Sequence, residues 1–453
     1  MQAINPATEQ PLKNYPNHSN EEVTSTIDQA QKAFTEWRNT SYSNRADLMR
    51  KAAEVLRTQQ KSFAAIMTEE MGKTLKESKA EVEKCAWVCD YYADHAEEFL
   101  KDEFIETDAS KCYVSHRPLG IVFAIMPWNY PFWQVFRFAA PGLMAGNVAI
   151  LKHAPNVPGC AEAILSVFEK AGFPKGVFSN LFITNEQASD VIAHRYVKAV
   201  TLTGSTRAGK EVAKQAGAVL KKCVLELGGS DPYIILEDAD LDLAIETTVA
   251  SRLKNSGQSC ISAKRFIVPE SIKEEVEQRL IKEMGSYSFG DPTDENTDLG
   301  PLVGEKYRDQ LHDQVKRTIE AGAKCILGGE VPDMKGYYYP PTILTNVKKG
   351  MPAYEEELFG PVATVITVKD EEEALKVAND TYYGLGGAIF SKDVARAERL
   401  AAEKLEAGSC FVNAMVSSDP RLPFGGINES GFGRELSHHG IKEFVNVKTV
   451  YVR

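Results

Sequence analysis

A cysteine and a glutamate near the middle of the sequence are of the types needed for covalent chemistry on a carbonyl carbon. Cys260 ends the segment NSGQSC, where a glycine-containing turn would present its thiol. Glu226 stands upstream in LELGGSDP, at the end of an apolar run and directly before two glycines. A thiolate is a strong nucleophile, and a carboxylate among apolar neighbours has a raised pKa that suits a general base. A lone cysteine is more often buried and inert, so this interpretation depends on the residues that accompany the pair.

Two turns carry polar groups that such a reaction would use. The rigid turn PWNYP interrupts an apolar run and would hold the amide of Asn129 toward a reacting oxygen. The segment TGSTRAG, residues 203–209, joins an apolar run to a helical one and suits a phosphate, because a helix N-terminus offers unpaired N–H groups. Each signal is weak by itself, since asparagine and glycine are also the usual residues of plain turns.

The bulk composition excludes several classes of protein. The chain of 453 residues carries a formal charge of −11 and is 43% hydrophobic, which is ordinary for a packed globular enzyme. An acidic balance argues against general binding of nucleic acid or of anionic membranes, since both require a basic surface. The first residues show no signal-peptide pattern, and no apolar run of about 18 residues occurs. We therefore expect a cytoplasmic protein.

The cysteines and histidines predict neither disulfides nor a metal site. The eight cysteines are scattered along the chain, without the density of a disulfide scaffold, and are expected to be reduced thiols. Cys85 and Cys89 would share one face of a helix, but no second Cys or His cluster completes a tetrahedral site. Both are better interpreted as core residues of a helix.

Alternating helical and strand-like segments predict the fold that positions the reactive groups. Apolar residues recur at helical spacing from Glu21 to about Leu100, and after Lys111 short β-like runs alternate with helical ones. Strands that alternate with helices predict parallel, doubly wound sheets, and the length favours two such units with a boundary near Gly228 and Gly229. The final run, EFVNVKTVYVR, is β-like and needs a pairing partner, which we expect in another subunit.

Taken in order, the motifs resemble those of the aldehyde dehydrogenase superfamily over nearly the whole chain. MPWNYP, LTGS, LELGGSDP, GQSC, EEELFGPV and PFGG occur in the family's order. SDPRLPFGG, LKHAPNVPGCA and WQVFRFAAP look most similar to the bacterial succinate-semialdehyde dehydrogenase branch. The resemblance implies an α/β fold with a Rossmann-type cofactor domain, an α/β catalytic domain and a small β oligomerisation unit, assembled as a homodimer or homotetramer. The expected bounds are 1–103 and 121–227 for the dinucleotide-binding domain, 228–424 for the catalytic domain, and 104–120 and 441–453 for the oligomerisation unit.

The same resemblance implies a role for individual residues. Cys260 would be the nucleophile, Glu226 the base, and Asn129 with the Cys260 backbone N–H the oxyanion hole. The residues expected to hold NAD or NADP are Trp128, Lys152, Pro155, Gly204, Ser205, Glu357 and Phe359. A thiohemiacetal on Cys260 would lose a hydride to the nicotinamide, and water activated by Glu226 would then hydrolyse the thioester to the acid.

Pro155 departs from the pattern of many relatives that prefer NAD. Those relatives carry a carboxylate three residues after the lysine that binds the adenosine ribose, which is Lys152 here, and the carboxylate accepts hydrogen bonds from the ribose hydroxyls. A proline removes the repulsion that a carboxylate would exert on a 2′-phosphate, but it donates nothing to bind that phosphate. NAD and NADP therefore both remain open as the cofactor.

Three further residues are expected to bind the substrate. Arg137 follows Asn129 by about two helical turns, and with Ser418 it is expected to clamp the distal carboxylate of a short ω-semialdehyde, succinate semialdehyde being favoured. Trp133 would wall the apolar part of the tunnel. The alternative is that Arg137 forms an ordinary ion pair with a carboxylate elsewhere in the fold.

Three other functions compete with this interpretation. A CoA-acylating semialdehyde dehydrogenase would pass the acyl group to CoA, but Glu226, a base that activates water, would waste its thioester. A thiol hydrolase would need Cys260 and Glu226 and no dinucleotide, which leaves Ser205, Lys152 and Glu357 without a role. A non-catalytic structural protein is disfavoured because every reacting group is present.

Overall fold

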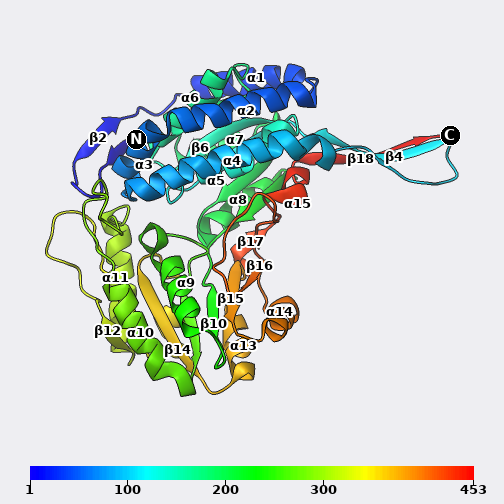
Figure 1. The fold of residues 1–453 in the computed structure, drawn as a ribbon. Helices are drawn as coiled ribbons and strands as arrows, with labels where there is room; N and C mark the ends of the chain where they lie inside the picture. The colour runs from blue at the N-terminus through cyan, green and yellow to red at the C-terminus, as the bar shows by residue number, and fades with distance from the viewer.

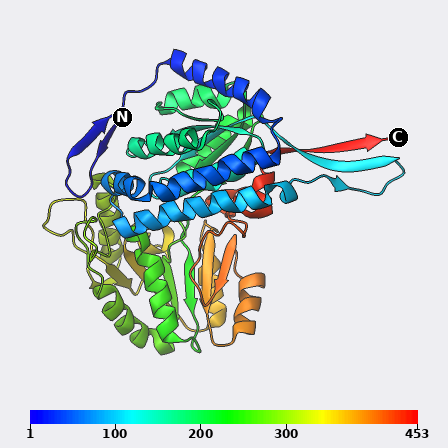
Figure 2. The ribbon, with the colours of Figure 1, turned by 45° about the horizontal axis from the view of Figure 1, so that its top comes forward.

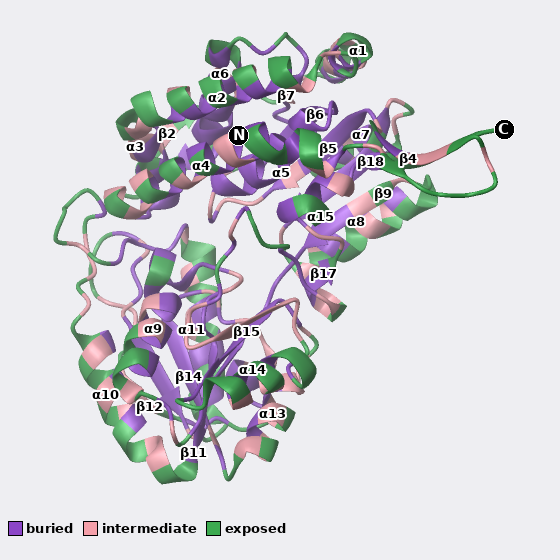
Figure 3. Cartoon of the chain, turned by 45° about the vertical axis from the view of Figure 1, so that its right-hand side comes forward, coloured by how far each residue is buried: buried purple, intermediate pink, exposed green.

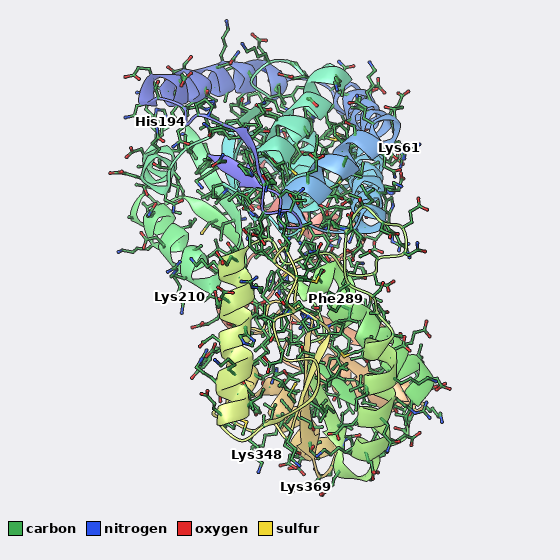
Figure 4. The ribbon with its side chains drawn as sticks, turned by 90° about the vertical axis from the view of Figure 1, so that its left-hand side faces the viewer. Lys61, His194, Lys210, Phe289, Lys348 and Lys369 are labelled. Atoms are coloured by element: carbon green, nitrogen blue, oxygen red, sulfur yellow. The ribbon has the colours of Figure 1, made fainter.

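The computed structural model describes residues 1–453 and divides them into two α/β lobes and a projecting arm (Figure 1). A six-stranded sheet forms the centre of the first lobe, a seven-stranded sheet that of the second, and a three-stranded sheet forms the arm. In Figure 4, Lys61 and His194 mark the first lobe, and Lys348 and Lys369 mark the far end of the second. The predicted α/β class with two mainly parallel sheets is confirmed.

The first lobe begins with helices whose ends match sequence signals. Ser19 caps the first helix in a capping box with Glu22, and the buried face of that helix carries the predicted apolar spacing. The helices are α1 (Asn20–Trp37), α2 (Tyr42–Thr58), α3 (Gln60–Met71), α4 (Leu75–Phe99), α5 (Trp133–Met144), α6 (Pro158–Ala171), α7 (Asn185–Ala193) and α8 (Thr206–Ala218). The strands are β5 (Ile121–Met126), β6 (Val148–His153), β7 (Phe178–Asn180), β8 (Val197–Thr203), β9 (Lys222–Glu226) and β17 (Gly431–Phe432), with a separate hairpin of β1 (Gln2–Ile4) and β2 (Pro11–Asn14).

The strand order of the first sheet places three predicted site residues at one edge. The order is β17-β9-β8-β5-β6-β7, and every pair is parallel except β17 with β9. The chain moves outward from β5 to β6 and β7, then returns to the other side of β5 for β8 and β9, so the order reverses at β5. Ligands bind outside the carboxyl ends of the strands at such a point. Asn129, Ser205 and Glu226 lie at the carboxyl ends of β5, β8 and β9.

The second lobe adjoins that edge. Its helices are α9 (Leu241–Leu253), η1 (Lys254–Gly257), η2 (Glu270–Ile272), α10 (Lys273–Gly285), α11 (Glu305–Glu320), α12 (Pro352–Glu355), α13 (Glu371–Asn379) and α14 (Val394–Glu403). Its strands are β10 (Pro232–Ile235), β11 (Arg265–Pro269), β12 (Lys324–Leu327), β13 (Thr342–Thr345), β14 (Val362–Val368), β15 (Gly386–Phe390) and β16 (Ser409–Val412), in the order β12-β13-β14-β11-β10-β15-β16. The short link from β9 to β10 sets the carboxyl edge of the first sheet against the amino edge of the second. Cys260 precedes β11 at that amino edge.

The chain returns to the first lobe after the second sheet is complete. The short helix η3 (Asn428–Ser430) leads into β17, which pairs with β9 so that Gly431 lies opposite Glu226. The helix α15 (Ser437–Lys442) then packs on α4 and α5. The predicted bounds assigned no domain to residues 425–440, and the structure attaches this segment to the first lobe.

The arm combines a hairpin with the end of the chain (Figure 1, Figure 2). Strands β3 (Glu103–Phe104), β4 (Lys111–Pro118) and β18 (Val445–Val452) form an antiparallel sheet in the order β18-β4-β3. The terminal strand thus pairs with a strand of its own chain, with Val445 opposite Pro118, whereas the sequence led us to expect its partner in another subunit. The outer edge of β18 has no strand beside it.

The buried residues lie mainly along the strands of the two sheets, which are covered by helices (Figure 3). Cys85 and Cys89 are fully buried on α4, as predicted for core residues. All eight cysteines are free thiols. None of the helices is long and apolar enough to cross a lipid bilayer.

Candidate active site

Two cavities meet at Cys260. The first, called the cleft here, has a volume of about 710 Å³ and lies between strand ends of the first lobe and residues 356–359 of the second. The second, called the tunnel, has a volume of about 150 Å³ and is lined by α4, α5 and residues 415–418. Cys260 and Gln134 are the two residues that line both. The sulfur can therefore meet one molecule from the tunnel while a second occupies the cleft.

A strained turn presents Cys260 between the cavities. Helix α9 ends at Leu253, and Asn255, Ser256 and Gly257 follow with φ of 55°, 52° and 74°, all in the left-handed region. A Cβ on Gly257 would lie 2.2 Å from the carbonyl carbon of Gly360, so glycine is required there. Left-handed non-glycine residues are costly and persist where surrounding contacts hold them. The glycine of the GQSC motif is thus explained by a close backbone approach.

The side chain of Asn129 is tied to the same turn. Its Nδ2 donates to the Gln258 carbonyl at 3.1 Å, and Asn255 Nδ2 donates to the Asn129 carbonyl at 2.8 Å. An amide nitrogen carries two hydrogens, so one N–H of Asn129 remains to donate. The Cys260 backbone N–H takes part in no hydrogen bond of the structure. The turn therefore provides two uncommitted donors of the kind that stabilise an oxyanion.

A carboxylate from α4 fixes the start of α5, which follows the turn of Asn129. Helix α5 has no side-chain cap of its own. Glu81 Oε1 accepts from the Phe132 N–H at 2.8 Å and the Trp133 N–H at 2.9 Å, and the other oxygen pairs with the buried Lys73. A carboxylate at a helix N-terminus is stabilised by the free N–H groups and the helix dipole. Glu81 thereby holds both the Asn129 turn and the wall of the tunnel.

Burial controls the protonation of Cys260. It raises the pKa of the thiol to about 12, against the opposing charges of Lys264 and Arg137. Lys264 is buried, donates to the Cys260 carbonyl at 2.7 Å and forms an ion pair with Glu357 at 3.1 Å. Cys260 is therefore a thiol at neutral pH in this state, and additional positive charge near the sulfur would be needed to favour the thiolate.

Glu226 is a buried carboxyl without a hydrogen-bond partner. Its side chain sits at the end of β9, 2% exposed, and neither oxygen is bonded. Burial, and next the carboxylate of Glu435, raise the pKa of Glu226 well above its usual range, although Arg137 and Arg434 oppose this. Glu226 lines neither cavity. A base must come within hydrogen-bond reach of the proton that it removes, so Glu226 would have to turn toward Cys260 to act.

Five of the seven residues predicted to hold a dinucleotide line the cleft together. They are Trp128, Gly204, Ser205, Glu357 and Phe359. Ser205 caps α8 by accepting from the Ala208 N–H at 3.3 Å, and Trp128 packs edge-on against Phe359. Lys152 and Pro155 do not line the cleft: Lys152 is buried at the end of the neighbouring β6, and Pro155 is exposed just beyond it.

The cleft fits a dinucleotide by its own geometry. A Cβ on Gly209 would lie 2.5 Å from the Leu227 side chain, so this glycine lets α8 pack closely against the segment after β9. The N-terminus of α8 then lies at the carboxyl edge of the sheet. The backbone N–H groups of Thr206 and Arg207 have no hydrogen-bond acceptor in the structure, so both are free to bind a phosphate. The volume of the cleft lies within the usual range for cofactor sites.

The three predicted substrate residues line the tunnel. Ser418 Oγ accepts from Trp133 Nε1 at 3.0 Å. Arg137 reaches the tunnel wall, but its Nε forms an ion pair with the buried Glu435, and its Nη2 donates to Thr203 Oγ1 at 3.2 Å. Arg137 therefore lines the tunnel, as a substrate-binding residue would, and also forms the ion pair that the alternative interpretation expects. Its binding of a substrate carboxylate stays a prediction.

Sequence reasoning missed several residues of this site. Lys264 lies four residues after Cys260, and its position near the start of a buried strand was a usable signal of a buried cation. Glu435, Glu81 and Lys84 approach the site through long-range packing, and nothing in their local sequence indicates it.

The chain matches the model of the Aldehyde dehydrogenase family over residues 1–450. It is 51% identical over 449 residues to a probable succinate-semialdehyde dehydrogenase [NADP(+)] of Synechocystis sp., with 99% of each chain covered. It is 46% identical to a succinate semialdehyde dehydrogenase [NAD(P)+] of Escherichia coli, covering 99% of this chain and 97% of the relative.

A crystal structure of succinic semialdehyde dehydrogenase from Streptococcus pyogenes, in complex with NADP+, superposes with a TM-score of 0.98 at 41% identity, covering 100% of this chain and 99% of the other. The resemblance predicted from the ordered motifs is confirmed by these matches across the full length. With both the sequence and the geometry in agreement, the chain belongs to the aldehyde dehydrogenase family.

Proposed function

We propose that this protein oxidises succinate semialdehyde to succinate, with NADP preferred over NAD. The observation that carries the proposal is the placement of Cys260 at the junction of a dinucleotide-sized cleft and a small tunnel that contains cations and hydroxyl groups. The names of the relatives agree with it. The residue three positions after Lys152 is the exposed Pro155, so no carboxylate at that position would repel the 2′-phosphate of NADP.

In this proposal the first lobe binds the dinucleotide and the second supplies the nucleophile. Ser205 and the N-terminus of α8 hold the pyrophosphate, and Glu357 holds the ribose next to the nicotinamide. The bound nicotinamide supplies the hydride acceptor and a positive charge near the sulfur. Cys260 loses its proton to solvent, and its thiolate forms the S–C bond to the aldehyde carbon while the C=O π bond breaks. The oxygen that gains this electron pair accepts from the Asn129 side chain and the Cys260 N–H.

Glu226 serves the second half of the reaction. After the hydride has left, the acyl group is held as a thioester on Cys260. Glu226 turns toward the sulfur and removes a proton from water, which attacks the thioester carbon and releases succinate and the thiol. The raised pKa of Glu226 favours proton transfer from water, because a more basic carboxylate is a better acceptor.

The tunnel suits a short substrate with a distal carboxylate. A cavity of about 150 Å³ is large enough for a molecule the size of benzene, and succinate semialdehyde is of similar size. Arg137, Lys84 and Lys254 bring positive charge to its wall, and Ser418 brings a hydroxyl. A buried carboxylate requires such partners.

A panel of aldehydes with each dinucleotide tests the function. We expect kcat/KM for succinate semialdehyde to exceed that for butanal, an uncharged aldehyde of equal length, by at least about tenfold, the value of one charge-assisted contact. Rates should be higher with NADP than with NAD, and added CoA should give no acyl-CoA. Equal use of butanal would contradict the substrate, turnover without dinucleotide would indicate a thiol hydrolase, and acyl-CoA formation would indicate the CoA-acylating reaction.

The proposal includes the compartment and the assembly. A free thiol at Cys260 is needed for the chemistry and all eight cysteines are free, which suits the reducing cytoplasm. The arm carries exposed apolar side chains, including Phe104 at 68%, Val447 at 61% and Tyr451 at 52%. Such side chains beside an unpaired strand edge favour a homodimer or homotetramer built through the arm.

Removing the terminal strand should disrupt this assembly. Deletion of residues 445–453 removes β18 and exposes the edge of β4, so we expect monomers or aggregates by size-exclusion chromatography with light scattering. Val447→Lys should give monomers without unpairing β4. Leu220→Lys, at a position that is 95% exposed on the first lobe, is the matched control and should leave the assembly intact. An oligomer that survives both arm variants would refute this role of the arm.

A further inference from the structure

Lys84 is a cation of the tunnel that has no acidic partner. It lies on α4, and its Nζ donates to Ser418 Oγ at 2.9 Å. The same Nζ lies 4.2 Å from the centre of the Trp133 ring, a distance at which the ring face attracts a cation. No ion pair of the structure includes Lys84. Its charge is therefore available to a molecule in the tunnel.

Arg137 differs from Lys84 in this respect. Its charge is offset by the buried carboxylate of Glu435, and two of its nitrogens are engaged by Glu435 and Thr203. A buried ion pair presents little net charge to a third group, whereas an uncompensated ammonium attracts an anion strongly in a low-dielectric site. The tunnel wall thus has one cation compensated by a carboxylate, Arg137, and two without an ion pair, Lys84 and Lys254. Lys254 is exposed to solvent, whereas Lys84 is held against Ser418 and Trp133.

Lys84 and Ser418 together have the donors that a carboxylate requires. An ammonium has three hydrogens, of which one is used on Ser418. Ser418 Oγ accepts from both Lys84 and Trp133, so its own hydrogen is left to donate. The Trp133 indole fixes the hydroxyl, and its ring supports the ammonium. The two groups form an ordered pair of donors before any substrate arrives.

We propose that Lys84, acting with Ser418, binds the distal carboxylate of the substrate and sets the preference for an ω-carboxylated aldehyde. This inference rests on the proposed function and names the residue responsible for its specificity. Arg137, in this arrangement, keeps Glu435 paired next to Glu226 and contributes to substrate binding less than Lys84 does.

The protonation of Lys84 supports this assignment and gives it a second readout. Burial, together with the nearby cations of Lys254 and Arg137, lowers the pKa of Lys84 to about 7. The other titratable groups that face it are Glu81 and Cys85 on its own helix and Asp419 of the loop that carries Ser418. A bound carboxylate would favour the charged ammonium, so the carboxylate should bind best below pH 7. KM for succinate semialdehyde should rise as the pH increases through about 7.

Lys84→Met tests the inference, since methionine keeps the length of the side chain and removes its charge. The readout is the ratio of kcat/KM for succinate semialdehyde to that for butanal, measured with the same dinucleotide. This ratio should fall by about tenfold to a hundredfold, mainly through KM, as expected for one charge-assisted contact. Lys84→Arg should restore most of it. Lys76→Met, an exposed position on the same helix and outside both cavities, is the matched control and should keep the wild-type ratio.

The outcomes separate this inference from the proposed function. If the wild type prefers succinate semialdehyde and Lys84→Met keeps that preference, the role of Lys84 is overturned and the function stands. If the wild type shows no preference, both are overturned. Should Lys84→Met fail to fold, Ser418→Ala and the pH dependence of the wild type decide: an unchanged ratio together with a KM that does not vary through about pH 7 overturns the inference.

Discussion

Replacement of Cys260 by alanine is expected to abolish dehydrogenase turnover while the protein still folds and binds the dinucleotide. Cys260 is the one cysteine that lines the cleft or the tunnel, so no other thiol of the chain can replace it. The loss should be on the order of 10⁴-fold or more, because removal of a covalent nucleophile leaves only binding and the oxyanion donors. Alanine removes a single sulfur next to two cavities, and we expect little change in stability.

The measurement is the formation of reduced dinucleotide from succinate semialdehyde, together with dinucleotide affinity by calorimetry. Cys410→Ala is the matched control, since Cys410 is a half-buried free thiol on β16 outside both cavities. This variant should retain turnover. Substantial activity of Cys260→Ala would refute the assignment of the nucleophile, and loss of dinucleotide affinity would show that the substitution had damaged the cleft.

The site residues whose placement could be predicted are those that a local motif specifies. A short segment with a recognisable turn precedes each of Cys260, Asn129 and Ser205. The ends of parallel strands meet at one edge of a doubly wound sheet, so residues that follow them are expected to lie close together. Gly257 belongs to such a motif, although the reason for the glycine is a long-range contact, because a Cβ there would collide with the backbone of Gly360. A motif of this kind carries its own structural requirement, so the sequence alone identifies it.

The residues that could not be predicted act through distant packing. Lys84 reaches Ser418 across more than half of the chain, and Glu435 reaches Arg137 only because β17 returns to the first sheet. The alternation of helices and strands does not predict a two-residue strand such as β17, since it has too few residues for a periodic pattern. Lys152 is a different case: its motif matches the family, but its side chain does not line the cleft, and its role in binding the dinucleotide stays a prediction.

The terminal strand illustrates why a sequence can predict that a segment is a strand without predicting which strand pairs with it. Its β-branched pattern required pairing, and the structure supplies β4 of the same chain along its full length. Alternating hydrophobicity specifies which residues are extended, whereas the choice of partner depends on where the chain places the other edge. The inter-subunit contact therefore stays a prediction for the outer edge of β18.

Replacement of Glu226 by glutamine is expected to leave a burst of reduced dinucleotide followed by a stall. Hydride transfer precedes hydrolysis of the thioester, so a variant that lacks the base should complete the first step once and accumulate the acyl-enzyme. Formation of the thiolate relies on the nearby positive charges, among them Lys264, and so should survive the change. Glutamine has the shape of the glutamate and removes repulsion from Glu435, so the fold should be retained.

Stopped-flow absorbance would give the burst, and mass spectrometry of the quenched enzyme would give the acyl adduct on Cys260. Because the pKa of Glu226 is raised well above its usual range, a wild type limited by hydrolysis should turn over faster as the pH rises and this carboxyl loses its proton. Glu226→Gln should lose that dependence. Glu237→Gln, at an exposed carboxylate just beyond β10, is the matched control and should behave as the wild type. Steady turnover of Glu226→Gln at the wild-type rate would show that another group activates water, and a missing burst would assign Glu226 to the activation of Cys260 itself.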